Sequence, residues 1–86
     1  MNVLPGDMQR AAQLLDCCDY CLARARAAQF GRDLNEAERW VKEFLRCKRD
    51  LDELVRRKEE HDRLMEVVEM MKEKGIDIAI ITRGNK

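Results

Sequence analysis

The sequence contains few aromatic residues and few residues that break helices. Aromatics make up 5% of its 86 residues, and there are one proline and four glycines. Charged residues, by contrast, make up 40% of the chain, against roughly 25% in an average protein. A chain of this length forms one domain at most, spanning residues 1–86, and buries only about 60% of its unfolded surface. The composition therefore predicts a mostly α-helical domain with a small core and heavily solvated faces.

The chain also lacks net charge. Seventeen basic residues balance seventeen acidic ones, and the balance holds separately in residues 1–30, 31–60 and 61–86. Nucleic-acid-binding surfaces usually carry a basic stripe, because phosphate contacts dominate their affinity. Here acids and bases alternate at helical spacing, as in Glu38 with Lys42 and Glu53 with Arg57. Such alternation is typical of a solvated helix surface, so we do not expect nucleic acid as a partner.

Long hydrophobic runs are absent as well. No stretch approaches the ~20 apolar residues that span a bilayer, and residues 1–10 show no apolar run flanked by basic residues. We expect no membrane partner and a cytoplasmic location, where the four cysteines would stay reduced. The sequence has no Gly-rich phosphate loop, and no nucleophile–base pair accompanies its single histidine. These absences predict a protein that is not an enzyme and carries no cofactor.

Two apolar stripes at helical spacing predict two helices. The first is expected over about residues 7–30, after the turn of Leu4, Pro5 and Gly6, with Asp7 as N-cap. Gly31 follows the last periodic residue, where a left-handed position favours glycine. The expected core stripe consists of Met8, Ala11, Leu14, Leu15, Cys18, Cys21, Leu22, Ala25 and Ala28.

The second helix is expected over about residues 35–74. Asn35 with Glu38 forms a capping-box pattern, and Asp33 with Glu36 is an alternative register. No glycine or proline interrupts the polar residues 56–63, so we predict one helix about 60 Å long, although a break near 57–62 would fold it back. Its expected core stripe is Ala37, Val41, Phe44, Cys47, Leu51, Leu54 and Val55, with Trp40 beside it.

The short connection makes the two helices antiparallel. If the turn is centred near residue 32, facing residue numbers sum to about 64. Cys17 and Cys18 are then level with Cys47, and position 7 faces position 57. By the same arithmetic residues 1–4 should lie near residue 61. The second helix consequently extends beyond the first, and its last turns, residues 64–71, are apolar around most of their circumference.

The C-terminal end cannot complete itself within one chain. Residues 76–82 are β-branched and bounded by Gly75 and Gly84, which predicts one short strand that must pair between chains. We therefore expect a homodimer or higher oligomer that also binds another protein. Its predicted interface comprises Leu64, Met65, Val68, Met71, Ile76, Ile78 and Ile80. The fold class is thus an antiparallel helical hairpin with a long, coiled-coil-like second helix and one C-terminal strand.

The favoured functional hypothesis is a non-enzymatic protein–protein interaction module, a small helical adaptor or inhibitor that binds a larger protein or assembly. Tyr20, off the first helical stripe, is a candidate contact residue. Lys58 and His61 lie where the second stripe turns polar, and they would either bind a ligand in an interface pocket or fix the register between chains.

The alternative hypothesis is a metal- or small-ligand-binding helical oligomer. Cys18 and Cys21 on one helix, with Cys47 level with them on the other, would supply three thiolates. The competing interpretation is that these three cysteines fill the core as small hydrophobic residues. A fourth ligand would have to come from Cys17, from Glu43 or from a second chain. Cys17 lies on the flank of the stripe, where it would otherwise be reactive or cross a dimer interface.

Overall fold

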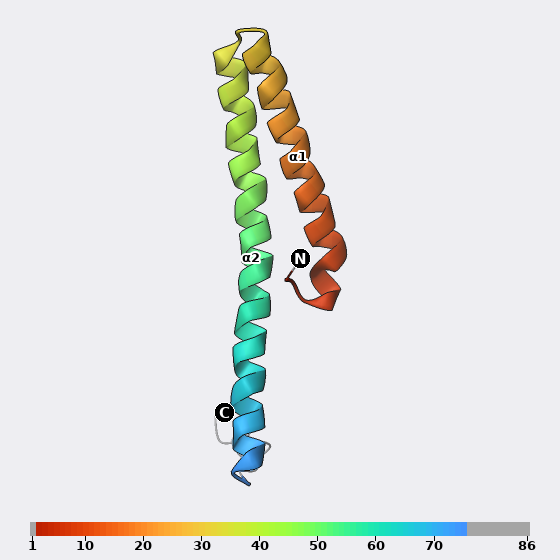
Figure 1. Ribbon diagram of the computed structural model, residues 1–86, viewed down its shortest axis with the longest axis vertical. Coiled ribbons are helices and arrows are strands. Elements are labelled where there is room, and N and C mark those ends of the chain that lie inside the picture. Colours follow the sequence, from red (N-terminus) through yellow and green to blue (C-terminus); the bar gives the residue numbers. More distant parts are fainter. Residues whose placement is uncertain (1, 76–86) are drawn as a thin grey trace, which may run out of the picture.

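The computed structural model describes residues 2–75 and shows two long helices packed side by side as a hairpin (Figure 1). A single turn of 3-10 helix, η1 (Pro5–Asp7), leads into α1 (Met8–Phe30), and α2 (Leu34–Glu73) returns antiparallel to it. The predicted hairpin and the uninterrupted second helix are confirmed. The predicted strand over residues 76–82 lies outside the described residues.

The loop between the helices is a Schellman motif. The Asp33 amide donates to the Ala28 carbonyl at 2.9 Å, and the Arg32 amide donates to the Gln29 carbonyl at 3.0 Å. The left-handed residue is Arg32, with φ of 63°, whereas Gly31 has φ of −79°. The prediction that Gly31 adopts the left-handed conformation is wrong, because the Gly31 amide still follows the helix and donates to the Ala27 carbonyl.

The start of α2 uses the alternative of the two predicted capping registers. The Asp33 carboxylate accepts a hydrogen bond from the Glu36 amide at 3.1 Å, and it therefore caps one of the free N–H groups of the first turn. Asn35 lies inside the helix instead. Helix α2 starts at this earlier register because the residue that directly follows the left-handed Arg32 is the capping residue Asp33.

The core is a narrow seam between α1 and α2, closed at one end by the N-terminal segment. Val3 packs with residues of both helices, so within the described residues the N-terminal segment does not extend toward residue 61 as predicted. The chain folds back between the helices where they diverge (Figure 1). The buried residues of the described chain are Val3, Ala11, Leu14, Cys18, Cys21, Ala25, Cys47 and Leu54.

Several residues of the predicted stripes are not in this seam. Met8, Leu15, Leu22 and Val41 were expected in the core and are exposed, with between 41% and 60% of their surface accessible. The physical reason is geometric, because two helices touch along one line of contact and each apolar stripe is wider than that line. The flank of each stripe therefore remains at the surface.

The predicted register between the helices is confirmed by two contacts. The Arg57 guanidinium donates to the Asp7 carboxylate at 2.9 Å, and the Cys17 and Cys47 sulfurs are 2.6 Å apart. Both pairs of residue numbers sum to 64. Asp7 occupies the N-cap position of α1 as predicted, but its side chain forms no capping hydrogen bond. It is engaged by Arg57, which leaves Glu53 to pair with Arg56 rather than with Arg57.

The hairpin is thin and elongated. Its principal extents are 65 × 22 × 16 Å and its radius of gyration is 20.4 Å, against about 12 Å for a compact domain of this chain length. The contact between Asp7 and Arg57 marks where α1 begins. Beyond it, residues 58–73 of α2 continue without a helix beside them (Figure 1), and we call this segment the α2 extension.

Candidate functional site

The α2 extension exposes most of its large apolar side chains. The accessible fraction is 60% for Leu64, 42% for Met65, 45% for Val67 and 54% for Met70. Val68 and Met71 are half-buried. Four of the predicted interface residues, Leu64, Met65, Val68 and Met71, thus lie on one uncovered helix segment, and Ile76, Ile78 and Ile80 lie outside the described residues. The structure does not test their role as an interface.

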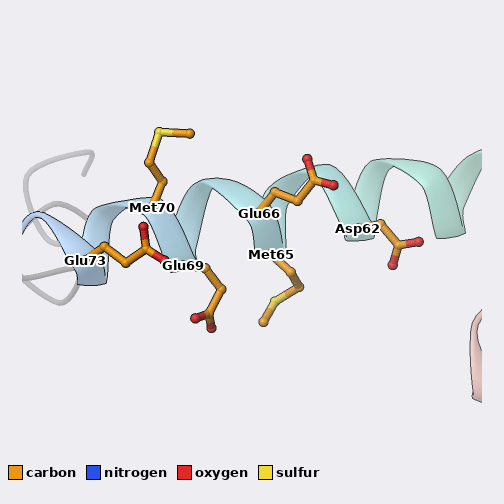
Figure 2. Close-up of a pocket in the computed structure, with 6 residues that line it drawn as sticks. All are labelled: Asp62, Met65, Glu66, Glu69, Met70 and Glu73. Atoms are coloured by element: carbon orange, nitrogen blue, oxygen red, sulfur yellow. The ribbon is translucent and has the colours of Figure 1, made fainter.

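A shallow groove on the α2 extension combines methionines with carboxylates. Figure 2 shows Met65 and Met70 projecting from the helix among four acidic side chains. Glu66, Glu69 and Glu73 are the acidic residues that the sequence places on the solvated side of this segment, and Asp62 completes the lining. Methionine is unbranched and adapts to irregular surfaces, so this segment suits packing against another helix.

Lys58 and His61 lie at the start of the α2 extension, and Lys58 is paired within its own helix. The Lys58 ammonium donates to both oxygens of the Asp62 carboxylate, at 2.6 and 2.5 Å, one helical turn away. His61 is exposed. In the single chain the pair of Lys58 with Asp62 resembles the other intrahelical ion pairs of α2, and each such pair contributes about a few tenths of a kcal/mol.

An aromatic and cationic cluster joins the two helices near the loop. Tyr20 of α1 meets Trp40 of α2 edge to face, with ring centroids 5.6 Å apart. The guanidinium groups of Arg24 and Arg39 lie over the Trp40 ring at 5.5 and 5.0 Å. Tyr20 therefore helps to hold the two helices together through its contact with Trp40. It also keeps 57% of its surface exposed, so it remains available as a contact residue.

Glu36 connects this cluster to the start of α2. Its carboxylate accepts hydrogen bonds from Arg39 at 2.5 Å and from the Trp40 indole at 3.1 Å. The hydrogen bond from Arg39 is the main reason why the pKa of Glu36 lies below its ordinary value.

Three cysteines converge halfway along the hairpin, and they are not the three that the sequence suggested. The sulfur atoms of Cys17, Cys21 and Cys47 all lie within 4.8 Å of one another. Cys18 is buried but separate from this group, which we call the thiol cluster. Cys17 is half-buried, whereas Cys21 and Cys47 expose 2% and 3% of their surface. The predicted level of Cys17 with Cys47 is confirmed.

The surroundings keep the buried thiols protonated. A hydrogen bond with Cys17, together with burial, raises the pKa of Cys47 to about 12. Burial is the main cause of the raised pKa of Cys21, and likewise of the raised pKa of Cys18. These thiols are therefore poor nucleophiles at neutral pH.

Sequence reasoning missed one apolar surface, which lies on the flank of the hairpin near the loop. Leu22 of α1 and Leu34 and Val41 of α2 line a shallow groove there, with Ala25 and Ala37 at its base. The seven-residue spacing between Leu15 and Leu22, and between Leu34 and Val41, was a usable signal for this flank.

No protein-family model, curated protein or solved structure matches the chain. Within residues 2–75, no helix is both long enough and apolar enough to cross a membrane.

Proposed function

We propose that this chain is a non-enzymatic protein-interaction module that works as a homo-oligomer. In this proposal the α2 extension of one copy packs against a second copy and buries Leu64, Met65, Val68 and Met71. The same interface would take in Ile76, Ile78 and Ile80, which the sequence assigns to it. The assembled module then acts in the cytoplasm as an adaptor or inhibitor of a larger protein.

The observation that carries the proposal is the uncovered α2 extension beside a very small core. Of the eight buried residues in the described chain, three are cysteines and two are alanines. Twelve large hydrophobic side chains are exposed, four of them on the α2 extension. Exposed apolar side chains that outnumber the buried ones support an interaction site on this surface.

A second copy is the occupant that best fits this surface. The shortage of buried apolar area belongs to the chain itself, and an identical copy is available wherever the chain is present. Residues 62–74 carry three basic and four acidic side chains, so no strong field of one sign opposes their self-association. Each buried leucine, valine or methionine would contribute about 1.5–3 kcal/mol before the cost of association.

Sedimentation equilibrium at micromolar concentration tests the proposal with two matched variants on α2. Leu64→Glu places a charge on the α2 extension, and Val41→Glu places the same charge on the flank of the hairpin. We expect the wild-type chain and Val41→Glu to sediment as oligomers and Leu64→Glu as a monomer. A monomeric wild-type chain would refute the proposal. If Val41→Glu alone dissociates, the interface is the flank and the assignment to the α2 extension is wrong.

A further inference from the structure

The thiol cluster brings together three metal-binding atoms from two helices. Cys17 and Cys21 are one turn apart on α1, and Cys47 reaches them from α2. The two buried members expose only 2% and 3% of their surface, and the half-buried Cys17 leaves an approach from solvent. The cluster is thus enclosed on one side and open on the other.

Cys18 is an internal comparison, because it is a buried cysteine that only fills the core. It is buried to 5% exposure in the same stretch of α1, yet its sulfur is not among the three that converge. Filling a core requires only apolar volume, and it does not require sulfur atoms to face one another. The convergence of Cys17, Cys21 and Cys47 is therefore a feature that packing alone does not explain.

The three sulfurs lie near enough to one another to bind a single ion after a small movement of Cys17. A metal–sulfur bond of about 2.3 Å in tetrahedral geometry separates two ligand sulfurs by about 3.8 Å. The sulfurs of the thiol cluster lie within 4.8 Å of one another, and the shortest separation is 2.6 Å between Cys17 and Cys47. Rotation of the half-buried Cys17 side chain, moving its sulfur by about 1 Å, would separate the sulfurs of Cys17 and Cys47 to the distance found in a metal site.

From this geometry we infer that Cys17, Cys21 and Cys47 form a binding site for one thiophilic metal ion of the Zn(II) or Cu(I) class. This site is independent of the proposed self-association. Three thiolates satisfy a trigonal Cu(I) ion, whereas Zn(II) takes a fourth ligand. Binding forms three metal–sulfur bonds and releases the three thiol protons to solvent, and the oxidation state of the metal does not change.

A Zn(II) ion needs a fourth ligand besides the three thiolates. Glu43 is half-buried, and its carboxylate accepts a hydrogen bond from Arg46 at 2.7 Å, so it is engaged in an ion pair and is not among the groups that converge on the three sulfurs. In this inference water is the fourth ligand of Zn(II), and it reaches the ion from the open side at Cys17. A bound ion would cross-link α1 to α2 at the middle of the hairpin.

Titration of the reduced full-length chain with Cd2+, Zn2+ and Cu(I) tests the inference. Cd2+ gives an ultraviolet sulfur-to-metal charge-transfer band, and elemental analysis after desalting gives the number of bound ions. We expect one ion per chain, with a band intensity that corresponds to three thiolates. Comparison of Zn2+ with Cu(I) by competition against a chelator shows which of the two the site favours.

Four serine variants separate this site from general thiol binding. Cys17→Ser, Cys21→Ser and Cys47→Ser should each lower the affinity for Cd2+ by at least about 100-fold, more than the loss of an outer-shell partner usually costs. Cys18→Ser is the matched control and should bind as tightly as the wild-type chain.

Circular dichroism shows whether each variant is still helical. If the variants at buried positions unfold, Cys17→Ser tests the metal site, because Cys17 is the most exposed of the four cysteines. The inference is overturned if the wild-type chain shows no charge-transfer band. It is equally overturned if Cys17→Ser binds normally, or if Cys18→Ser loses affinity to the same extent as the other three.

Discussion

At the scale of single residues, the loop between the helices places an arginine in the left-handed conformation. The glycine before it has a negative φ, which any residue could adopt. Arg32 has φ of 63° and Gly31 has φ of −79°. A Cβ atom added to Gly31 would lie 3.7 and 3.8 Å from the Ala28 and Ala27 carbonyl oxygens, which is ordinary contact. The two residue types therefore stand one position away from where the backbone would favour them.

Exchanging these preferences should stabilise the hairpin. Gly31→Ala should raise the free energy of unfolding by about 0.4–1 kcal/mol, because alanine restricts the unfolded chain. Arg32→Gly should be neutral or stabilising by up to about 1 kcal/mol, because it relieves the left-handed strain. Urea unfolding followed by circular dichroism measures both. Destabilisation by Gly31→Ala would show that the loop has a different backbone conformation.

Glu36 makes the loop end of the hairpin sensitive to acid. Because its pKa in the folded chain is below the ordinary value of 4.5, its interactions stabilise the fold fully above that pH. They are lost as the pH falls through the lower, folded-state pKa. Trp40 is the only tryptophan, and its indole donates a hydrogen bond to the Glu36 carboxylate. The tryptophan fluorescence should therefore change as Glu36 is protonated, with a midpoint below pH 4.5.

Glu36→Gln is the control for this titration. Glutamine keeps an oxygen near the Trp40 indole but does not titrate, so the fluorescence change below pH 4.5 should disappear. A midpoint at or above 4.5 in the wild-type chain, or an unchanged transition in Glu36→Gln, would contradict the assignment.

At the scale of helices, sequence periodicity predicted the hairpin and its register. The contacts of Cys17 with Cys47 and of Asp7 with Arg57 both follow from a turn centred near residue 32. The register was predictable because the loop is short and each residue adds a fixed rise along a helix. No tertiary information was needed for this step.

Rotation about the helix axes was less predictable than position along them. The sequence favoured Cys18 as a partner of Cys21 and Cys47, and the structure turns Cys17 toward them instead. Cys17 and Cys18 lie four and three residues before Cys21, and both spacings bring side chains together on a helix, so periodicity alone does not choose between them. Periodicity also cannot choose whether Glu53 pairs with Arg56 or with Arg57, since both spacings bring side chains together.

The interface on residues 64–71 is a prediction of a different kind. Periodicity identified residues 64–71 as apolar, and the structure shows them uncovered, but a single chain contains no information about what covers them. Val3 shows how a segment outside any periodic pattern escapes this reasoning, because its burial depends on the chain folding back between two helices.

Removal of residues 76–86 tests the contribution of the predicted strand. We expect the shortened chain to dissociate, since Ile76, Ile78 and Ile80 would no longer pair between copies. Its helix content should remain, because the core seam and the Asp7–Arg57 contact lie elsewhere. Light scattering and circular dichroism give the two results. A shortened chain that stays oligomeric would show that the α2 extension is sufficient for association.

For the whole molecule, folding and association should be coupled. The hairpin has a narrow seam and a radius of gyration of 20.4 Å, and in the proposed oligomer part of the apolar surface that one copy exposes would be buried between copies. The midpoint of thermal unfolding should therefore rise with protein concentration, because association stabilises the folded chain by mass action. Leu64→Glu should remove this dependence, whereas Val41→Glu should retain it. A midpoint that is independent of concentration in the wild-type chain would contradict the coupling.

The 65 × 22 × 16 Å shape also determines how the molecule moves through solvent. An elongated particle experiences more friction than a sphere of equal mass, and it diffuses and elutes as if it were larger. A monomer of 10.1 kDa would thus imitate a compact dimer on a gel-filtration column. The frictional ratio from sedimentation velocity, obtained together with the mass, separates a long monomer from two copies packed side by side.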